Sequence, residues 1–429
     1  MNRGTQGIGA FGPNYLRSMR RSRRFLLLAP LPFLILPILA GISPGFGESG
    51  MQSASITKPG VDVLLESPAL LQGRRIGLVT HAAALTSSGE ATASALLRDS
   101  RFALAALFAP EHGLQGVVPA GQTVPDTPGR VPIYSLYSAT RRPTPEMMAA
   151  VDVFVIDLQD VGARAYTYIY TMALVMQAAR DAGKPVVVLD RPNPQGGLGL
   201  DGTVLDPEYR SFIGMFPIPS VHGMTIGELA YLFNGLFDVN ADLTVVPMRG
   251  WTRRMIWDET GLPWVRPSPN IINTLTPFYY GATGVLDGTN LSNGAGTAHA
   301  FQIVRSPWLD GDRLAGRLNA LGLPGIAFAP LETGNGGNAS QGIRLTLTDP
   351  LRFRPSTTAV HILAEIKKLH GDELAFVPRN GRHMFDLVWG TDDVRKAIQR
   401  GAPAHAIAAR WEPDLQRFQM LRSPYLIYP

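Results

Sequence analysis

The stretch Phe102-Ala-Leu-Ala-Ala-Leu-Phe108 runs directly into Ala109-Pro110-Glu111-His112-Gly113. Its first seven residues form a short apolar run, which is typical of a buried strand. The proline and glycine that follow end this strand, and they leave a carboxylate and an imidazole side by side just beyond it. Ligand-binding loops of α/β proteins collect at the carboxyl ends of the strands. Partial desolvation favours a protonated carboxyl group, so Glu111 is a candidate general acid. A turn with solvated side chains is the alternative.

Similar apolar runs lie on both sides of this stretch and alternate with helical patterns. Strands are predicted at 75–80, 102–108, 133–137, 151–157, 185–190 and 243–248, and helices at 91–99, 168–182 and 225–236. The run Pro185-Val-Val-Val-Leu-Asp190 is apolar without alternation, as in a strand buried on both faces. Repeated strand–helix order predicts an α/β fold with a mostly parallel sheet and helices on both faces.

The pattern changes near residue 296. Helices are predicted at 312–321, 357–369 and 391–400, a strand at 342–347, and a glycine- and asparagine-rich loop at 334–338. We therefore expect a catalytic domain at 60–295 and a smaller α+β auxiliary domain at 296–429. The glycine- and proline-rich loop 113–129 is long for a compact domain, which favours a functional lid.

The first 47 residues have the composition of a targeting segment. Arg20-Arg-Ser-Arg-Arg24 precedes the apolar run Phe25–Ile42, and small residues follow, which is the order of a secretory signal. We expect a signal peptide at 1–47, a linker at 48–59, and export to the periplasm or cell envelope. Contact with a membrane is expected only if this signal stays uncleaved. Prolines at 30, 32 and 37 disfavour that alternative, because they make a poor spanning helix.

The same segment explains the formal charge. It contains six arginines and no acid, whereas the whole chain has 39 basic and 34 acidic residues. Without the segment, the net charge changes from +5 to −1, so no basic footprint for nucleic acid is left. The chain has no cysteine, which excludes disulfides and a thiol nucleophile.

Polar side chains follow four strands of the predicted sheet. They are Thr80 and His81, Glu111 and His112, Asp157 and Asp160, and Asp190 and Arg191. Because the carboxyl ends of parallel strands lie along one edge, we expect these residues to line a common site. Each Asp alone is equally well explained as a helix cap or an Asx turn.

We expect neither a cofactor nor a metal. The segment Gly197-Leu-Gly199-Leu-Asp-Gly202 fits the dinucleotide pattern, but prolines separate it from the preceding strand, and Thr203-Val-Leu-Asp-Pro207 does not open a helix. The histidines at 112 and 222 lack the paired spacing of metal ligands. Neither a G-x-S-x-G elbow nor a phosphate-binding loop is present.

Taken together, the motifs of the chain resemble a known family, the NamZ-type exo-β-N-acetylmuramidases. The matching segments are Gly77–Thr80, Phe108–Gly113, Asp157–Arg164 with Tyr166-Thr-Tyr168, Leu189–Pro194, His222–Glu228, Pro267–Asn270 and Gly288–Asn290. They occur in the family's order and extend from about residue 60 to the C-terminus.

The resemblance implies a Rossmann-like domain joined to an auxiliary domain, and release of terminal N-acetylmuramic acid from the non-reducing end of peptidoglycan fragments. Glu111 matches the Glu proposed as catalytic in the family. One loop departs from the family pattern: Asp287 and Asn293 stand where glutamates are usual, Ala295 stands where an arginine is usual, and His299-Ala-Phe301 stands where Pro-Phe is expected. Losing that arginine could remove a partner for the lactyl carboxylate of the sugar.

Our leading hypothesis is a glycoside hydrolase with a peptidoglycan-derived saccharide as substrate. Glu111 is the proposed general acid, His112 orients it, and Asp287, Glu228, Asp160 or Asp157 is the second carboxylate. The candidate substrate-binding residues are Asp157, Asp160, Arg164, Tyr166, Asp190, Arg191, Asn193, His222, Glu228, Asn270 and Asn290. Among these, Arg164 or Arg191 could bind the lactyl carboxylate bidentately. A non-catalytic cell-wall saccharide binder is the main alternative, and an acyl or peptide hydrolase using Thr or Ser is a weaker one.

Overall fold

A computed structural model describes residues 56–331 and 341–429. The predicted signal peptide, most of the predicted linker and the loop predicted at 334–338 lie outside the described residues. Within the described ranges, no helix has both the length and the apolar character needed to cross a membrane.

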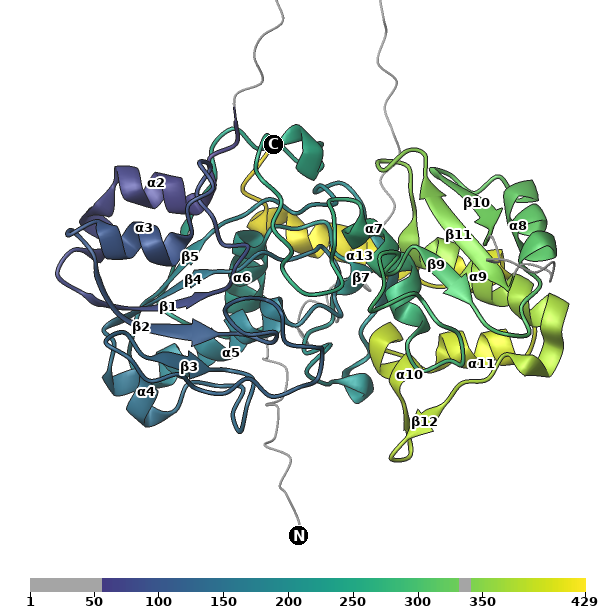
Figure 1. Cartoon of the computed structure of the whole chain (residues 1–429), viewed down its shortest axis with the longest axis horizontal. Coiled ribbons are helices and arrows are strands. Elements are labelled where there is room, and N and C mark those ends of the chain that lie inside the picture. Colours follow the sequence, from purple (N-terminus) through teal and green to yellow (C-terminus); the bar gives the residue numbers. More distant parts are fainter. Residues whose placement is uncertain (1–55, 332–340) are drawn as a thin grey trace, which may run out of the picture.

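A six-stranded parallel sheet forms the first half of the molecule (Figure 1). Its strands are β1 (Arg75–Thr80), β2 (Ala103–Ala109), β3 (Ile133–Ser135), β4 (Val153–Asp157), β5 (Val186–Leu189) and β8 (Leu243–Val246). They lie in the order β3-β2-β1-β4-β5-β8, and every pairing is parallel. This is the order of a doubly wound dinucleotide-binding fold, with its switch point between β1 and β4. The predicted α/β class and Rossmann-like sheet are confirmed.

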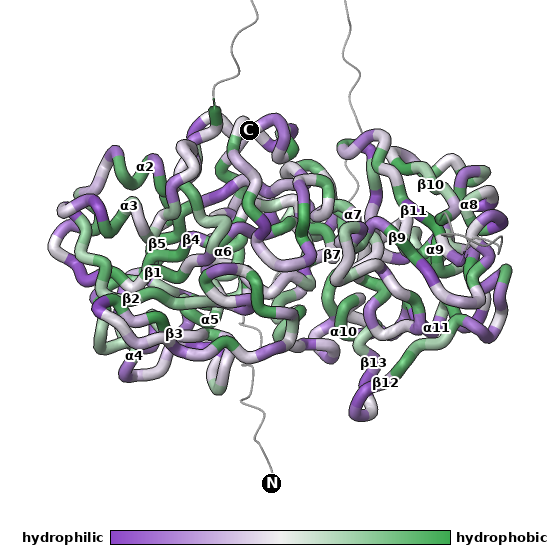
Figure 2. The backbone as a smooth tube through the Cα atoms, in the orientation of Figure 1, coloured by the Kyte–Doolittle hydropathy of each residue, from purple (hydrophilic) through white to green (hydrophobic). Residues whose placement is uncertain are grey.

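Alternation along the strands explains why both faces are covered. In β4, Val153 and Val155 pack with α2 (Gly60–Glu66) and α3 (Thr92–Arg98), whereas Phe154 and Ile156 belong to the core on the other face. That second face is covered by α4 (Pro145–Ala149), α5 (Tyr168–Asp181) and α6 (Ile226–Gly235). Figure 1 shows α2 and α3 on one side of the sheet and α4 and α5 on the other. In Figure 2 the sheet strands are largely coloured as hydrophobic.

The second half is built on a smaller antiparallel sheet. Its strands are β9 (Ile303–Arg305), β10 (Ile326–Pro330) and β11 (Gly342–Leu347), in the order β10-β11-β9. The helices of this half are α8 (Gly311–Ala320), α9 (Pro355–His370), α10 (Met384–Trp389), α11 (Asp393–Gln399) and α12 (Ala404–Ala408), and a hairpin joins β12 (Pro378–Arg379) to β13 (Arg382–His383). The pair β6 (Asp201–Val204) and β7 (Pro219–Val221), together with α7 (Thr276–Thr283), packs against α9 between the two sheets.

The end of the chain returns to the first half. After α13 (Glu412–Arg422), the Tyr428 hydroxyl donates to Asp190 at 2.5 Å, and the Ile427 amide donates to Glu228 at 2.9 Å. The Arg422 guanidinium donates to the carbonyls of His222 and Gly223 at 2.9 and 2.7 Å. The C-terminal segment therefore fixes the loops that follow β5 and β7.

Candidate active site

Glu111 lies just beyond the end of β2, and two hydrogen bonds hold its carboxylate. The Gly121 amide donates to Oε1 at 2.9 Å, and the Thr167 hydroxyl donates to Oε2 at 2.8 Å. The Tyr137 phenol, two residues beyond β3, lies close enough to interact electrostatically with the same carboxylate. Burial together with this neighbouring carboxylate raises the pKa of Tyr137 to about 12, so the phenol stays a donor. Only 6% of Glu111 is exposed, which means that the contacts hold it in one orientation.

The backbone at His112 explains how the following loop returns to Glu111. His112 has a φ of 72°, a conformation that non-glycine residues adopt rarely and mostly at functional positions. Its Nδ1 donates to the Val118 carbonyl at 2.7 Å, and the chain then brings the Gly121 amide onto Glu111. The groups that orient the carboxylate are therefore this amide and Thr167, whereas the His112 ring holds the loop.

Tyr280, on α7, stands close to three of the predicted acids. Burial raises its pKa well above the ordinary value, and the carboxylates of Asp287, Glu111 and Asp160 add to this effect. Its ring packs edge-on against Tyr166 and Phe301, with centroids 6.1 and 5.0 Å apart. Three acids from different loops thus lie within electrostatic range of one neutral phenol.

Asp160 is buried beside His222. Its Oδ2 accepts from the Gly162 amide at 2.7 Å and lies 3.3 Å from His222 Nε2. His222 Nδ1 accepts from the Met224 amide, so Nε2 carries the proton and faces the carboxylate. Oδ1 of Asp160 has no hydrogen-bond partner among the described residues. An unpaired buried oxygen of this kind is suited to accept from a bound hydroxyl or water.

Asp287 is the exposed acid of the group. Crowding by protein atoms raises its pKa, while a 3.2 Å hydrogen bond from Asn293 and the nearby Arg379 act in the opposite direction. The Asn293 amide also donates to the Thr283 carbonyl at 3.2 Å. The departure at residue 293 therefore puts a neutral donor, instead of a second acid, against Asp287.

Asn270 and Asn290, the other two predicted loop residues, form hydrogen bonds with different parts of the molecule. Asn270 accepts from the Gly296 amide at 2.8 Å and so ties the loop that contains Ala295 to the segment 267–270. Asn290 is bound to the second half of the molecule, because it accepts from the Ala375 amide and donates to the Glu373 carbonyl.

Two predicted arginines make their polar contacts with buried groups of the protein itself. Arg191 forms a buried bidentate pair with Asp157, which also accepts from Thr92 at 2.5 Å. Arg164 is fully buried and donates to the carbonyls of Thr203, Ile218 and Val388. Burial lowers the pKa of Arg164 to about 10. These contacts indicate structural roles, in which Asp157 and Arg191 neutralise each other and Arg164 joins three backbone segments.

Three further predicted site residues make structural contacts, namely Asp190, Asn193 and Glu228. Asp190 is fully buried and accepts from Thr225, the Gly227 amide and the C-terminal Tyr428, and burial raises its pKa to about 6. Glu228 completes the capping box of α6 and pairs with Arg253. Asn193 donates to the Met224 carbonyl at 3.1 Å. The partners of all three are groups that hold the loops after β5 and β7, and none of these partners is the carboxylate of Glu111.

Three residues of the site were missed by sequence reasoning: Tyr137, Thr167 and Tyr280. A signal existed for two of them, since Tyr137 follows the strand next to β2 and Thr167 directly precedes α5. Tyr280 lies in an ordinary helical segment, and only its position within electrostatic range of the three acids in the folded chain distinguishes it.

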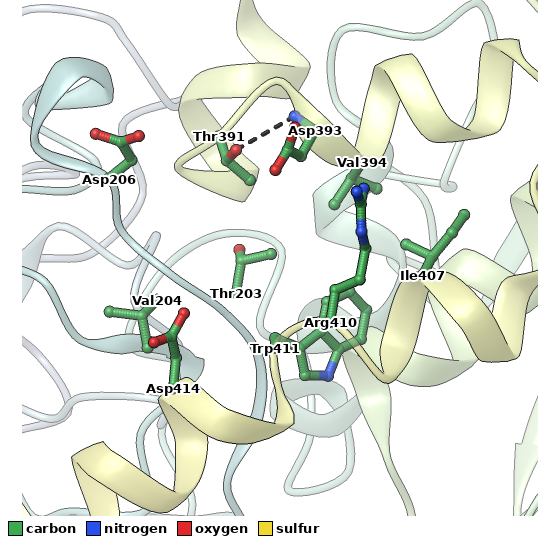
Figure 3. Close-up of a pocket in the computed structure, with 10 residues that line it drawn as sticks. All are labelled: Thr203, Val204, Asp206, Thr391, Asp393, Val394, Ile407, Arg410, Trp411 and Asp414. Atoms are coloured by element: carbon green, nitrogen blue, oxygen red, sulfur yellow. Dashed lines mark hydrogen bonds between the residues drawn. The ribbon is translucent and has the colours of Figure 1, made fainter. Parts of the chain in front are cut away.

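A pocket of about 200 Å³ lies elsewhere, between β6 and the C-terminal helices (Figure 3). Its lining includes three acids, one arginine and a tryptophan, namely Asp206, Asp393, Asp414, Arg410 and Trp411. None of its lining residues was predicted as functional. The segment 201–204 near it forms β6, so the glycine pattern that ends at Gly202 leads into a strand and not into a helix. No cluster of three or more metal-ligating side chains exists within 56–331 and 341–429.

Comparison with known proteins identifies the family. The family model described as exo-β-N-acetylmuramidase NamZ, N-terminal, matches residues 76–275, and its C-terminal counterpart matches residues 278–428. A peptidoglycan β-N-acetylmuramidase NamZ of Bacillus subtilis (strain 168) is 43% identical over 378 residues, which cover 86% of this chain and 91% of that protein.

Two solved structures of DUF1343 family proteins from Bacteroides fragilis NCTC 9343 are similar throughout. Their TM-scores are 0.80 and 0.66 at 35% and 29% identity, and each comparison covers 87% of this chain and 99% of the other. With both family models matched in order and the sheet and site described above, this chain belongs to the NamZ family of exo-β-N-acetylmuramidases, which are glycoside hydrolases.

Proposed function

We propose that this enzyme releases terminal N-acetylmuramic acid from the non-reducing end of peptidoglycan fragments, with Glu111 as the general acid. The observation that carries this proposal is a nearly buried carboxyl group at the end of β2 that two hydrogen bonds hold in place. A carboxylate has about four lone-pair positions. The two hydrogen bonds occupy one position on each oxygen, so positions remain for a proton directed at the glycosidic oxygen. The substrate class follows the activity named for the Bacillus relative.

We further propose Asp287 as the second carboxylate. Two of the four acids considered, Asp157 and Glu228, are fully buried and paired with arginine. Asp160 is buried beside His222, where it can hold a hydroxyl group through its free Oδ1. Asp287 is exposed, lies within electrostatic range of Tyr280, and accepts a hydrogen bond from Asn293. A solvent-accessible carboxylate is the one able to activate water or to stabilise an oxocarbenium-like centre.

The test is turnover of 4-nitrophenyl β-N-acetylmuramide by the full chain and by two variants. Glu111→Gln and Asp287→Asn are each expected to lower kcat by roughly 10²- to 10⁴-fold, because each removes a proton-transfer group. Glu90→Gln is the matched control, since Glu90 pairs with Arg98 on the surface. Undiminished activity of Glu111→Gln removes Glu111 from the role.

A non-catalytic saccharide binder is the second candidate, and the loss of an acid at Asn293 and of an arginine at Ala295 favours it. Binding of muropeptides in calorimetry, combined with no turnover over days by the wild-type chain, supports this candidate over hydrolysis.

We infer that the protein is exported, from the arginine-rich and apolar order of residues 1–47. Fractionation of a bacterial host that expresses the full chain tests this. The mature protein is expected outside the cytoplasm with a mass that lacks about the first 47 residues, whereas an intact cytoplasmic chain contradicts the inference.

A further inference from the structure

Arg141 lies in the loop after β3, against the ring of Tyr137. Its guanidinium carbon is 3.6 Å from the centre of that ring and 5.2 Å from the centre of the Phe212 ring. The same tyrosine also interacts electrostatically with the Glu111 carboxylate. Tyr137 is therefore a common neighbour of this cation and of the proposed general acid.

The loop holds Arg141 in a fixed place. Its Nη1 donates to the Ser138 carbonyl at 3.2 Å. Thr140 Oγ1 accepts from the Arg142 amide at 3.0 Å and donates to the Arg142 carbonyl at 2.5 Å, which closes a tight turn around Arg141. Stacking on an aromatic ring reduces the freedom of a guanidinium while its N–H edges stay available for a planar anion.

Arg141 also lacks an anionic partner. No carboxylate lies within 4.0 Å of its side chain in the described part of the chain, whereas the next residue, Arg142, pairs with Asp181. The guanidinium is half-buried, so it remains reachable from solvent. A half-buried, unpaired and oriented arginine beside a catalytic carboxylate is suited to bind an anionic group of the substrate.

We propose that Arg141 binds the lactyl carboxylate of N-acetylmuramic acid and so selects this sugar over N-acetylglucosamine. The inference rests on the proposed function, since it assumes that Glu111 faces the glycosidic oxygen. In the sugar, C1 carries that oxygen and C3 carries the lactyl ether, so the two groups are separated across a single six-membered ring. Because Glu111 and Arg141 are both neighbours of Tyr137, a single bound sugar ring can reach both groups. The lactyl carboxylate is also the only charge that distinguishes the two sugars.

This assignment replaces the two arginines expected from the sequence. Arg164 is held by three backbone carbonyls, and Arg191 is neutralised by Asp157. Arg141 also supplies a cation for the substrate carboxylate. The chain otherwise lacks the arginine that is usual in the family at this loop position, where it has Ala295.

The experiment measures dissociation constants for free N-acetylmuramic acid and free N-acetylglucosamine by calorimetry, in the wild-type chain and three variants. Arg141→Met is expected to weaken binding of N-acetylmuramic acid by roughly 10- to 100-fold, the worth of a charge-assisted bidentate contact, and to leave N-acetylglucosamine within about twofold. Arg141→Lys keeps the charge without the planar fork and is expected to give an intermediate loss. Arg142→Met is the matched control and is expected to change neither constant.

Binding of the free sugars does not require catalysis, so this experiment can succeed even if the chain hydrolyses nothing. A structural role for Arg141, as a support for Tyr137, predicts equal losses for both sugars. Equal losses, or an unchanged preference in Arg141→Met at unchanged melting temperature, overturn the proposal. With 4-nitrophenyl β-N-acetylmuramide, the same variant is expected to raise KM more than it lowers kcat.

Discussion

The Thr167 hydroxyl donates a 2.8 Å hydrogen bond to Oε2 of Glu111, across 56 positions of the sequence. Glu111 follows β2 and Thr167 precedes α5, so the bond links the loops of two strands that are separated in the sheet by β1. Together with the Gly121 amide on Oε1, it fixes both carboxylate oxygens. The orientation of the proposed acid is therefore set by tertiary contacts and not by the local turn.

Replacing Thr167 with valine is expected to lower kcat on the chromogenic muramide by about tenfold, because the carboxyl group loses one of its orienting donors. Thr167→Ser keeps the hydroxyl and is expected to retain most of the activity. Thr144→Val provides the control: it removes the N-cap of α4, costs about 1 kcal/mol of stability and leaves kcat unchanged. Equal kcat for Thr167→Val and wild type shows that this contact does not support catalysis.

Arg164→Met is expected to destabilise the fold by about 3 kcal/mol or more, measured as the free energy of unfolding in urea. The reason is that three buried carbonyls, of Thr203, Ile218 and Val388, lose their donor at once. Affinity for N-acetylmuramic acid is expected to stay unchanged in the protein that remains folded. Normal stability combined with weakened sugar binding in Arg164→Met contradicts the structural role of Arg164. For Arg141→Met, by contrast, normal stability and weakened sugar binding are the expected results.

His81 is expected to make the stability of the protein depend on pH. Burial, together with electrostatic repulsion from Arg191 and His112, lowers its pKa to about 3, whereas it is about 6.5 in an unfolded chain. Between these values the unfolded state binds the extra proton, so stability is fully present above pH 6.5 and is lost as the pH falls towards 3. His81→Asn is expected to reduce the slope of unfolding free energy against pH by up to about 1.4 kcal/mol per pH unit.

The comparison must be made between variant and wild type, because Asp190 acts in the opposite direction. Burial raises its folded pKa to about 6, so its contribution is present below about pH 4 and is lost as the pH rises through 6. His405→Asn, at an exposed histidine, serves as the control. An unchanged slope in His81→Asn means that His81 does not titrate differently in the two states.

The sequence determined the parallel sheet and the place of Glu111, because both depend on local patterns. Continuous apolar runs define β4 and its neighbours as strands buried on both faces, and strand–helix alternation makes them parallel. A polar residue after such a run must then lie at the carboxyl edge. The family motifs added the enzyme class, since they include that residue in a recognisable order.

The tertiary structure alone decided which charged residues act together. The sequence pointed to Arg164, Arg191 and Glu228 and not to Arg141, but burial of a charge is tolerated only when distant groups satisfy it. Carbonyls and charged side chains far along the chain satisfy the first three, whereas Arg141 keeps its free edge. Tyr280 likewise gains its place among the acids only when α7 packs beside the sheet, because side-chain proximity is a property of non-local packing.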